Sequence, residues 1–168
     1  TMCLTPGSIG VRANQKETIQ FAHHYGYEAV QPFGEELAAM SDAEREEWNG
    51  RRQEYKLLWG QSGLSVDFRK DDATFREGLK ALPASAAALK SVGASRMGTW
   101  ISPHHDSLPY LANLRQHAAR LREVASILGD HGQRLGLEYV GPKTLWSAKR
   151  FPFVHSMAEL RELLAEIA

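Results

Sequence analysis

The stretch RLGLEYVGP, residues 134–142, carries the pattern that decides the fold. Its residues Leu135, Leu137 and Tyr139 predict a buried strand. Glu138 lies in their midst, and a carboxylate is rarely buried in full unless another group pairs with it. Because side chains alternate between the two faces of a strand, Glu138 points away from these apolar neighbours. The strand therefore predicts one face that packs on helices and another that carries a carboxylate.

The composition predicts one globular domain and excludes several classes of partner. The chain has 168 residues, of which 43% are hydrophobic, and this is enough for a real core. Its 20 Lys and Arg residues balance 20 Asp and Glu residues, so we expect no nucleic-acid partner. No apolar run approaches the roughly 18 residues of a membrane helix, and no signal peptide is evident. The single cysteine, Cys3, excludes an intrachain disulfide, and a cytoplasmic location is expected.

Strand-like and helix-like segments alternate five times along the chain. The expected strands cover residues 8–11, 27–33, 64–69, 96–101 and 134–140. The expected helices cover residues 14–26, 41–62, 71–92, 109–131 and 156–167. Capping boxes open three of these helices, and Pro83 is expected to break or restart the third one. This alternation predicts a parallel sheet with helical crossovers.

Two architectures satisfy this alternation: an open, doubly wound sheet and a (β/α)8 barrel. Five units fill an open sheet but form only part of a barrel. The first strand–helix turn lacks the glycine-rich phosphate-binding motifs of nucleotide-binding sheets. The pattern alone leaves the choice between the two architectures open.

Five polar or aromatic residues lie late in the expected strands, on one inferred face. They are Gln31, Asp67, Arg69, Trp100 and Glu138. Active sites of both α/β architectures lie at the carboxyl ends of the strands. We therefore expect these side chains to surround one mouth and to bind a small molecule there.

Four of these candidates also have a purely structural interpretation. Glu138 pairs with Arg96 of the adjacent strand in that interpretation, and Asp67 and Arg69 form a surface pair. Trp100 belongs to the core, as most tryptophans do. The run HHD at residues 104–106 suggests a metal site, but adjacent histidines in a loop are more often solvated and no second cluster supports a ligand set.

Four stretches, taken in order, resemble the sugar phosphate isomerase/epimerase family, the xylose isomerase-like (β/α)8 barrels. They are PGSIGVRANQKETIQFAHHYGYEAV (6–30), GASRMGTWISP (93–103), HAARLREVASILGDHGQRLGLEYVGP (117–142) and RFPFVHSMAELRELLAEI (150–167). The resemblance implies that residues 1–168 form a single domain, the N-terminal portion of a TIM barrel. About five β/α units with parallel strands are present, and units six to eight are absent.

The resemblance also implies a chemistry. Family members hold a divalent metal, Mn²⁺ or Mg²⁺ with Zn²⁺ as an alternative, and move protons or hydride between adjacent sugar carbons. Glu138 occupies the place of the first metal ligand, whereas the three later ligands have no counterpart before Ala168. Gln31 stands where relatives often carry Glu, which weakens an acid–base role there. The expected function is a metal-dependent isomerase or epimerase of a sugar or sugar phosphate.

A partial barrel leads to further expectations. The chain alone should be inactive, and its two open sheet edges should make it self-associate. One alternative is a barrel hydrolase of the DNA-repair endonuclease type, although Ser102 and Pro103 stand where such an enzyme would carry a ligand. A second alternative is a non-enzymatic half-barrel that binds another chain through its edges.

Overall fold

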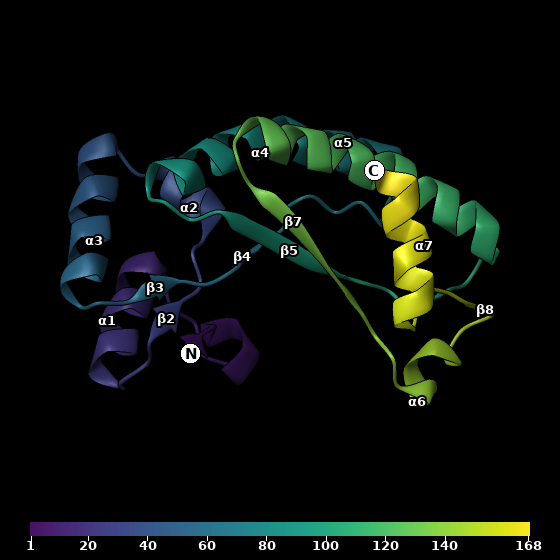
Figure 1. The fold of residues 1–168 in the computed structure, drawn as a ribbon, viewed down its shortest axis with the longest axis horizontal. Coiled ribbons are helices and arrows are strands. Elements are labelled where there is room, and N and C mark those ends of the chain that lie inside the picture. The colour runs from purple at the N-terminus through teal and green to yellow at the C-terminus, as the bar shows by residue number, and fades with distance from the viewer.

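The structure, a computed structural model that describes residues 1–168, is an arch in which helices cover one side of parallel strands (Figure 1). The strands are β1 (Cys3–Leu4), β2 (Ala29–Val30), β3 (Leu58–Trp59), β4 (Ser62–Gly63), β5 (Arg96–Ile101), β6 (His104–His105), β7 (Arg134–Tyr139) and β8 (Phe151–Pro152). The helices are α1 (Gln15–His24), α2 (Gly34–Ala39), α3 (Asp42–Glu54), α4 (Asp72–Ser91), α5 (Tyr110–Asp130), α6 (Lys143–Trp146) and α7 (Met157–Ile167), with a 3₁₀ turn at Pro6–Ile9.

The strands form two parallel sheets that continue one another. The first has the order β1-β2-β3 and the second the order β4-β5-β7. The register of β5 on β7 runs through six pairs, from Arg96 opposite Arg134 to Ile101 opposite Tyr139. A short antiparallel pair, β6 with β8, ties the segment after β5 to the segment before α7. The parallel α/β fold expected from the alternation is confirmed.

The main core lies between the second sheet and the helices α4, α5 and α7. Met97 and Ile101 of β5 are buried on this side, against leucines of the three helices such as Leu89, Leu121 and Leu163. A smaller cluster under α1 includes Ile19 and packs against the first sheet. The apolar face of each strand therefore meets the helix layer, as alternation predicts.

The third strand lies earlier than expected. Residues 64–69 alternate apolar and polar side chains but form no strand. The third position in the sheet is occupied instead by β3 and β4, and β4 ends at Gly63. The strand bends between them, so that β3 pairs with β2 and β4 pairs with β5. Val66 and Phe68 are buried as expected, but they lie in an extended loop against the helix layer. Burial on one side produced the period of two without a hydrogen-bonded ladder.

Other boundaries also differ from the expected ones. Residues 8 and 9 of the strand expected at 8–11 belong to the 3₁₀ turn, and the first strand is β1. Of the strand expected at 27–33, only Ala29–Val30 form a strand, β2. The helix expected to reach residue 62 ends at Glu54. Pro83 lies inside an unbroken α4. Its neighbour Leu82 is fully buried, and such packing compensates for the hydrogen bond that proline cannot make.

Each end of the strand arrangement is open. β1 pairs only with β2, and β7 pairs only with β5. The two edges expected to be unpaired are therefore present. No helix has both the length and the apolar content needed to cross a membrane.

Candidate functional site

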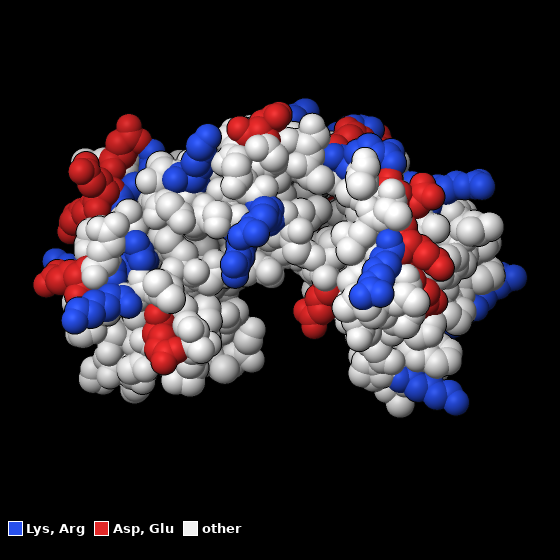
Figure 2. Space-filling view, viewed as in Figure 1, with Lys and Arg blue, Asp and Glu red and all other residues white.

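The sheet face turned away from the helices carries Trp100 and Glu138 side by side. The two residues are register partners on β5 and β7, one position before the strands end. Glu138 is exposed, and Trp100 is 49% exposed, so Trp100 is not a core residue. This is the hollow side of the arch in the space-filling view (Figure 2).

Two glycines make room on the same face for the amide of Gln61. A Cβ on Gly98 would lie 2.3 Å from the Gln61 Nε2 atom, and a Cβ on Gly136 would lie 3.2 Å from its Oε1 atom. Gln61, in the bend between β3 and β4, thus rests on a floor of glycines beside Trp100 and Glu138. It is a candidate site residue that the expected strand boundaries concealed.

Glu138 is a free carboxylate. It has no ion pair, and the structural interpretation that pairs it with Arg96 is wrong. Arg96 begins β5, four positions before the partner of Glu138 in the register. The strand is also less buried than its composition suggests, because Leu135, Leu137 and Tyr139 are only partly covered.

Arg69 reaches the end of β5 from the extended loop. Its Nη2 atom donates to the Thr99 Oγ1 atom at 2.9 Å and to the Trp100 carbonyl oxygen. The guanidinium carbon lies 4.3 Å from the centroid of the Phe68 ring and 4.5 Å from that of Trp100. Burial lowers the pKa of this guanidinium, although it remains charged near neutral pH. Arg69 therefore holds the backbone and ring of Trp100 in place.

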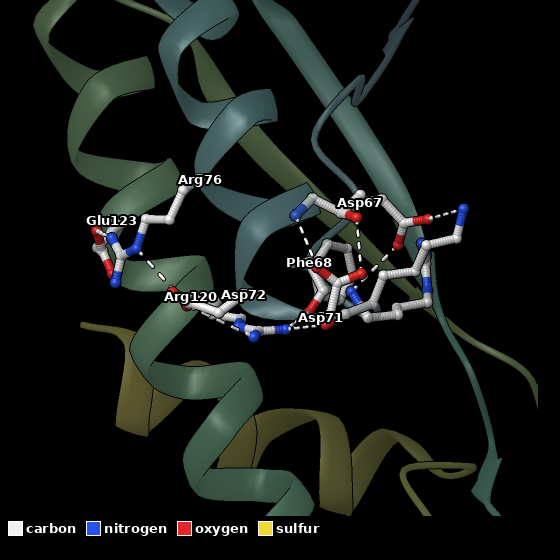
Figure 3. Close-up of polar contacts among 10 residues, drawn as sticks. Asp67, Phe68, Asp71, Asp72, Arg76, Arg120 and Glu123 are labelled. Atoms are coloured by element: carbon white, nitrogen blue, oxygen red, sulfur yellow. Dashed lines mark hydrogen bonds and ion pairs between the residues drawn. The ribbon is translucent and has the colours of Figure 1, made fainter.

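The loop that carries Asp67 and Arg69 is fixed by Arg120 of α5 (Figure 3). The Arg120 Nη1 atom donates to the Phe68 carbonyl oxygen at 2.9 Å and to that of Lys70. Its Nη2 atom lies 3.7 Å from the Asp72 carboxylate at the start of α4. These contacts satisfy loop carbonyls that would otherwise belong to a strand ladder. They explain how residues 67–70 keep a defined position without one.

Asp67 makes its contacts within its own loop. Its Oδ1 atom accepts the backbone N–H of Arg69 at 3.2 Å, and its Oδ2 atom lies 3.5 Å from Lys70 Nζ. The structure shows no ion pair between Asp67 and Arg69 side chains, so the predicted surface pair is replaced by one with Lys70. Its contacts do not reach the face that carries Glu138.

Gln31 lines a cavity of about 420 Å³ beyond the ends of β2 and β4. Ser62, Ser65 and the carboxylates of Glu35 and Glu36 line the same cavity. The carbonyl oxygen of Gln31 accepts from the Gln15 side chain at 3.3 Å. The structure thus brings Arg69, Trp100 and Glu138 together, whereas Gln31 has no hydrogen bond to any of them.

The donor set does not fit a metal ion. No group of three or more His, Cys, Asp or Glu side chains is placed to hold one anywhere in residues 1–168. Glu138 is a hard oxygen ligand of the kind Mn²⁺ and Mg²⁺ prefer, but one exposed carboxylate cannot complete their coordination. The two histidines of the run at residues 104–106 are less solvated than expected: His104 and His105 are half-buried and line a separate cavity, whereas Asp106 is exposed.

Sequence reasoning missed the polar residues of α5. Asn113, His117 and Arg120 are buried at intervals of four and three, on the face that also carries Leu121 and Val124. Burial lowers the pKa of the His117 imidazole to about 4, so the ring is neutral at pH 7. The signal was present, since polar side chains on an apolar helix stripe require buried partners.

Comparisons with solved structures identify the architecture. A xylose isomerase domain protein from Alicyclobacillus acidocaldarius superposes with a TM-score of 0.81 and 30% identity, over 99% of this chain and 59% of that one. The fold is that of the xylose isomerase-like barrels. The choice between an open sheet and a TIM-type barrel is thereby settled in favour of a partial barrel.

More distant xylose isomerase-like barrels agree. The IolI protein with a bound zinc atom matches with a TM-score of 0.71 and 15% identity, over 98% of this chain and 58% of that chain. A D-psicose 3-epimerase with D-tagatose, from Clostridium cellulolyticum H10, matches with a TM-score of 0.69 and 12% identity, over 93% of this chain and 55% of that chain. The chain spans less than three fifths of the length of each of these proteins. No protein-family model and no curated protein matches the sequence.

Proposed function

We propose that the chain is the N-terminal portion of a cytoplasmic, metal-dependent sugar isomerase or epimerase, with Glu138 as one metal ligand. The observation that carries the proposal is the exposed, unpaired Glu138 beside Trp100 at the carboxyl end of the parallel strands. In barrels of this kind that end of the strands holds the active site. The similarity to a xylose isomerase domain protein and the epimerase and zinc-containing neighbours support the same class of chemistry.

The side chains of this chain suit a sugar better than an apolar ligand. The exposed face of Trp100 can pack against the C–H face of a sugar, and Arg69 keeps the indole from rotating. The amides of Gln31 and Gln61 each offer a donor and an acceptor to hydroxyl groups. Gln31 cannot take up a proton as a carboxylate would, so it orients the substrate in this proposal.

The isolated chain is inactive in this proposal. Glu138 is the single ligand it offers on this face, and the remaining metal ligands would come from barrel units outside these residues. The proposal therefore assigns Glu138, Trp100, Gln31 and Gln61 to binding, and Arg69 to holding Trp100 in place. It assigns Asp67 to holding the loop of Arg69.

An assay of the natural gene product, whatever its length, tests the proposal. Interconversion of D-fructose and D-psicose with added Mn²⁺ is compared for the unmodified protein, Glu138→Gln and the control Glu47→Gln. Glu47 is an exposed carboxylate on α3 without an ion pair. Loss of turnover and of bound metal in Glu138→Gln alone supports the proposal. Equal activity of the two variants would refute the role of Glu138.

A second candidate is a non-enzymatic half-barrel that binds another copy or another chain. The open edges at β1 and β7 favour it, as does an apolar groove beside β1. In this case Glu138→Gln would leave association unchanged, and no metal would co-purify. An endonuclease-type hydrolase is less well supported, because acidic and basic side chains are interspersed on the face seen in Figure 2.

A further inference from the structure

A second cavity, of about 250 Å³, lies behind the end of β5, between the loop after that strand and α5. None of its lining residues is hydrophobic. Those that matter here are Arg69, His105, Asp106, Asn113 and His117. His105 belongs to β6, and the pairing of β6 with β8 holds the loop that forms this wall of the cavity.

Three unsatisfied buried atoms belong to residues that line this cavity. The whole chain has four buried side-chain nitrogen or oxygen atoms without a hydrogen-bond partner. Arg69 Nε, Asn113 Oδ1 and His117 Nε2 are three of them. Asn113 and His117 are only 1% and 3% exposed. A buried polar atom without a partner is costly, and a native cluster of such atoms indicates a group that completes them.

The hydrogen-bonding roles of these atoms follow from their neighbours. The His117 Nδ1 atom lies 3.0 Å from the Asn113 carbonyl oxygen, so Nδ1 carries the proton and Nε2 is an acceptor. The Asn113 Oδ1 atom is also an acceptor, whereas Arg69 Nε is a donor. The His105 Nδ1 atom accepts the backbone N–H of Leu108 at 2.8 Å, which leaves the proton on Nε2 as a further donor.

The cavity also contains the positive charge of Arg69, which burial destabilises and which the nearby Asp67 carboxylate offsets only in part. Arg69 has no carboxylate within ion-pair distance. Asp106, which also lines the cavity, pairs with Lys149 at 3.1 Å, and Asp67 pairs with Lys70. A partly buried guanidinium forms its strongest hydrogen bonds with an anionic oxygen. The missing group should therefore carry a negative charge as well as a hydrogen-bond donor.

We propose that this cavity binds a small α-hydroxycarboxylate. One carboxylate oxygen accepts from Arg69 Nε, the other accepts from His105 Nε2, and the hydroxyl donates to His117 Nε2. The three unsatisfied atoms are shielded from solvent, so binding requires small side-chain shifts of the kind that are common in complexes. The site lies behind β5 and does not use Glu138, and its occupation requires no turnover.

Three small molecules distinguish the contribution of the carboxylate to binding from that of the hydroxyl. Glycolate carries the carboxylate and the hydroxyl, acetate lacks the hydroxyl, and ethylene glycol lacks the charge. Titrations of the 168-residue chain are followed by calorimetry and by the NMR signal of the Arg69 Nε–H group. We expect glycolate to bind at least about fivefold more tightly than acetate, which corresponds to one added hydrogen bond. Ethylene glycol should not bind measurably.

Two variants and one control assign the contacts. Arg69→Gln should abolish binding of both anions, whereas Arg96→Gln removes an exposed arginine from the far end of β5 and should change nothing. His117→Phe keeps an aromatic ring against Phe68 and Phe153 but removes the acceptor. It should bring glycolate down toward the affinity of acetate. If Arg69→Gln does not fold, the Arg69 signal of the unmodified chain still decides the question.

The proposal is overturned if glycolate at tens of millimolar leaves the Arg69 signal unmoved, because the cavity would then hold only water. It is also overturned if acetate or ethylene glycol binds as tightly as glycolate, or if Arg96→Gln weakens binding as much as Arg69→Gln. Failure of the sugar isomerase proposal would appear instead as absent turnover with glycolate binding intact.

Discussion

At the scale of the residue, His117 makes stability depend on pH. The imidazole has its ordinary pKa of 6.5 in the unfolded chain, whereas burial lowers the value to about 4 in the folded one. Between these values the unfolded chain binds more protons, so stability falls as the pH falls through this range. The difference in pKa corresponds to about 3 kcal/mol. The folded chain keeps this stabilisation in full above pH 6.5 and loses it as the pH falls toward 4.

Urea denaturation at several pH values measures this effect. The unmodified chain should lose about 3 kcal/mol more between pH 7 and pH 4 than His117→Phe does. Carboxylates that titrate in the same range affect both proteins equally, so the difference isolates the imidazole. Parallel pH profiles of the two proteins would show that the His117 imidazole has the same pKa in the folded and the unfolded chain.

Alternation within β5 and β7 was sufficient to predict the environment of single residues there. It correctly turned Trp100 and Glu138 to one face and Met97 and Ile101 to the other. It could not place Arg69, whose contacts with Thr99 and Trp100 depend on the path of a loop. The contacts of Arg120 with that loop span about 50 positions in the sequence, and no local pattern encodes them.

At the scale of the element, two helical glycines have opposite roles. A Cβ on Gly50 of α3 would meet no atom within 4 Å, whereas a Cβ on Gly78 of α4 would lie 3.1 Å from the Val66 Cα atom. Gly50→Ala should therefore stabilise the chain by about 1 kcal/mol, the usual gain in a helix interior. Gly78→Ala should lower stability, because the backbone at Val66 must move away from the helix.

Thermal and urea unfolding of the two variants provide a matched comparison, since each adds one methyl group to a helix. An equal increase in the free energy of unfolding for both variants would mean that α4 is not closely packed against the loop at Val66. Opposite signs would support the close packing that holds residues 66–70 under α4 and α5.

The long elements could be predicted and the short ones could not. Asn14, Ser41 and Ser156 cap their helices as their spacing indicates. By contrast, β3 and β4 have two residues each, too few for any periodicity, and their positions depend on pairing with β2 and β5. Gly60 illustrates this dependence: a Cβ there would lie 2.6 Å from the Sγ atom of Cys3, a residue of β1, which is separated from β3 by β2 in the sheet.

At the scale of the whole molecule, the open edges predict self-association. The groove beside β1 is lined by eight residues, none of them charged: Met2, Leu4, Pro6, Ile9, Val11, Phe21, Tyr25 and Tyr27. Open edges and apolar grooves of this kind promote association. We expect light scattering at micromolar concentration to give a mass above that of one chain.

A matched pair of charge substitutions locates the contact. Ile9 in the groove and Leu111 on α5 are both 62% exposed. Ile9→Glu should shift the chain toward the monomer, whereas Leu111→Glu should leave its mass unchanged. A monodisperse monomer before any substitution would contradict the expectation.

The central claim is that this partial barrel presents Glu138 as one ligand of a set that the chain does not complete. Equilibrium binding of Mn²⁺ to the 168-residue chain, followed by the electron paramagnetic resonance of the free ion, tests it most directly. The account predicts no stoichiometric site at micromolar Mn²⁺, and no difference between the unmodified chain and Glu138→Gln. A stoichiometric micromolar site that Glu138→Gln abolishes would contradict it, because the chain would then hold the metal without further barrel units.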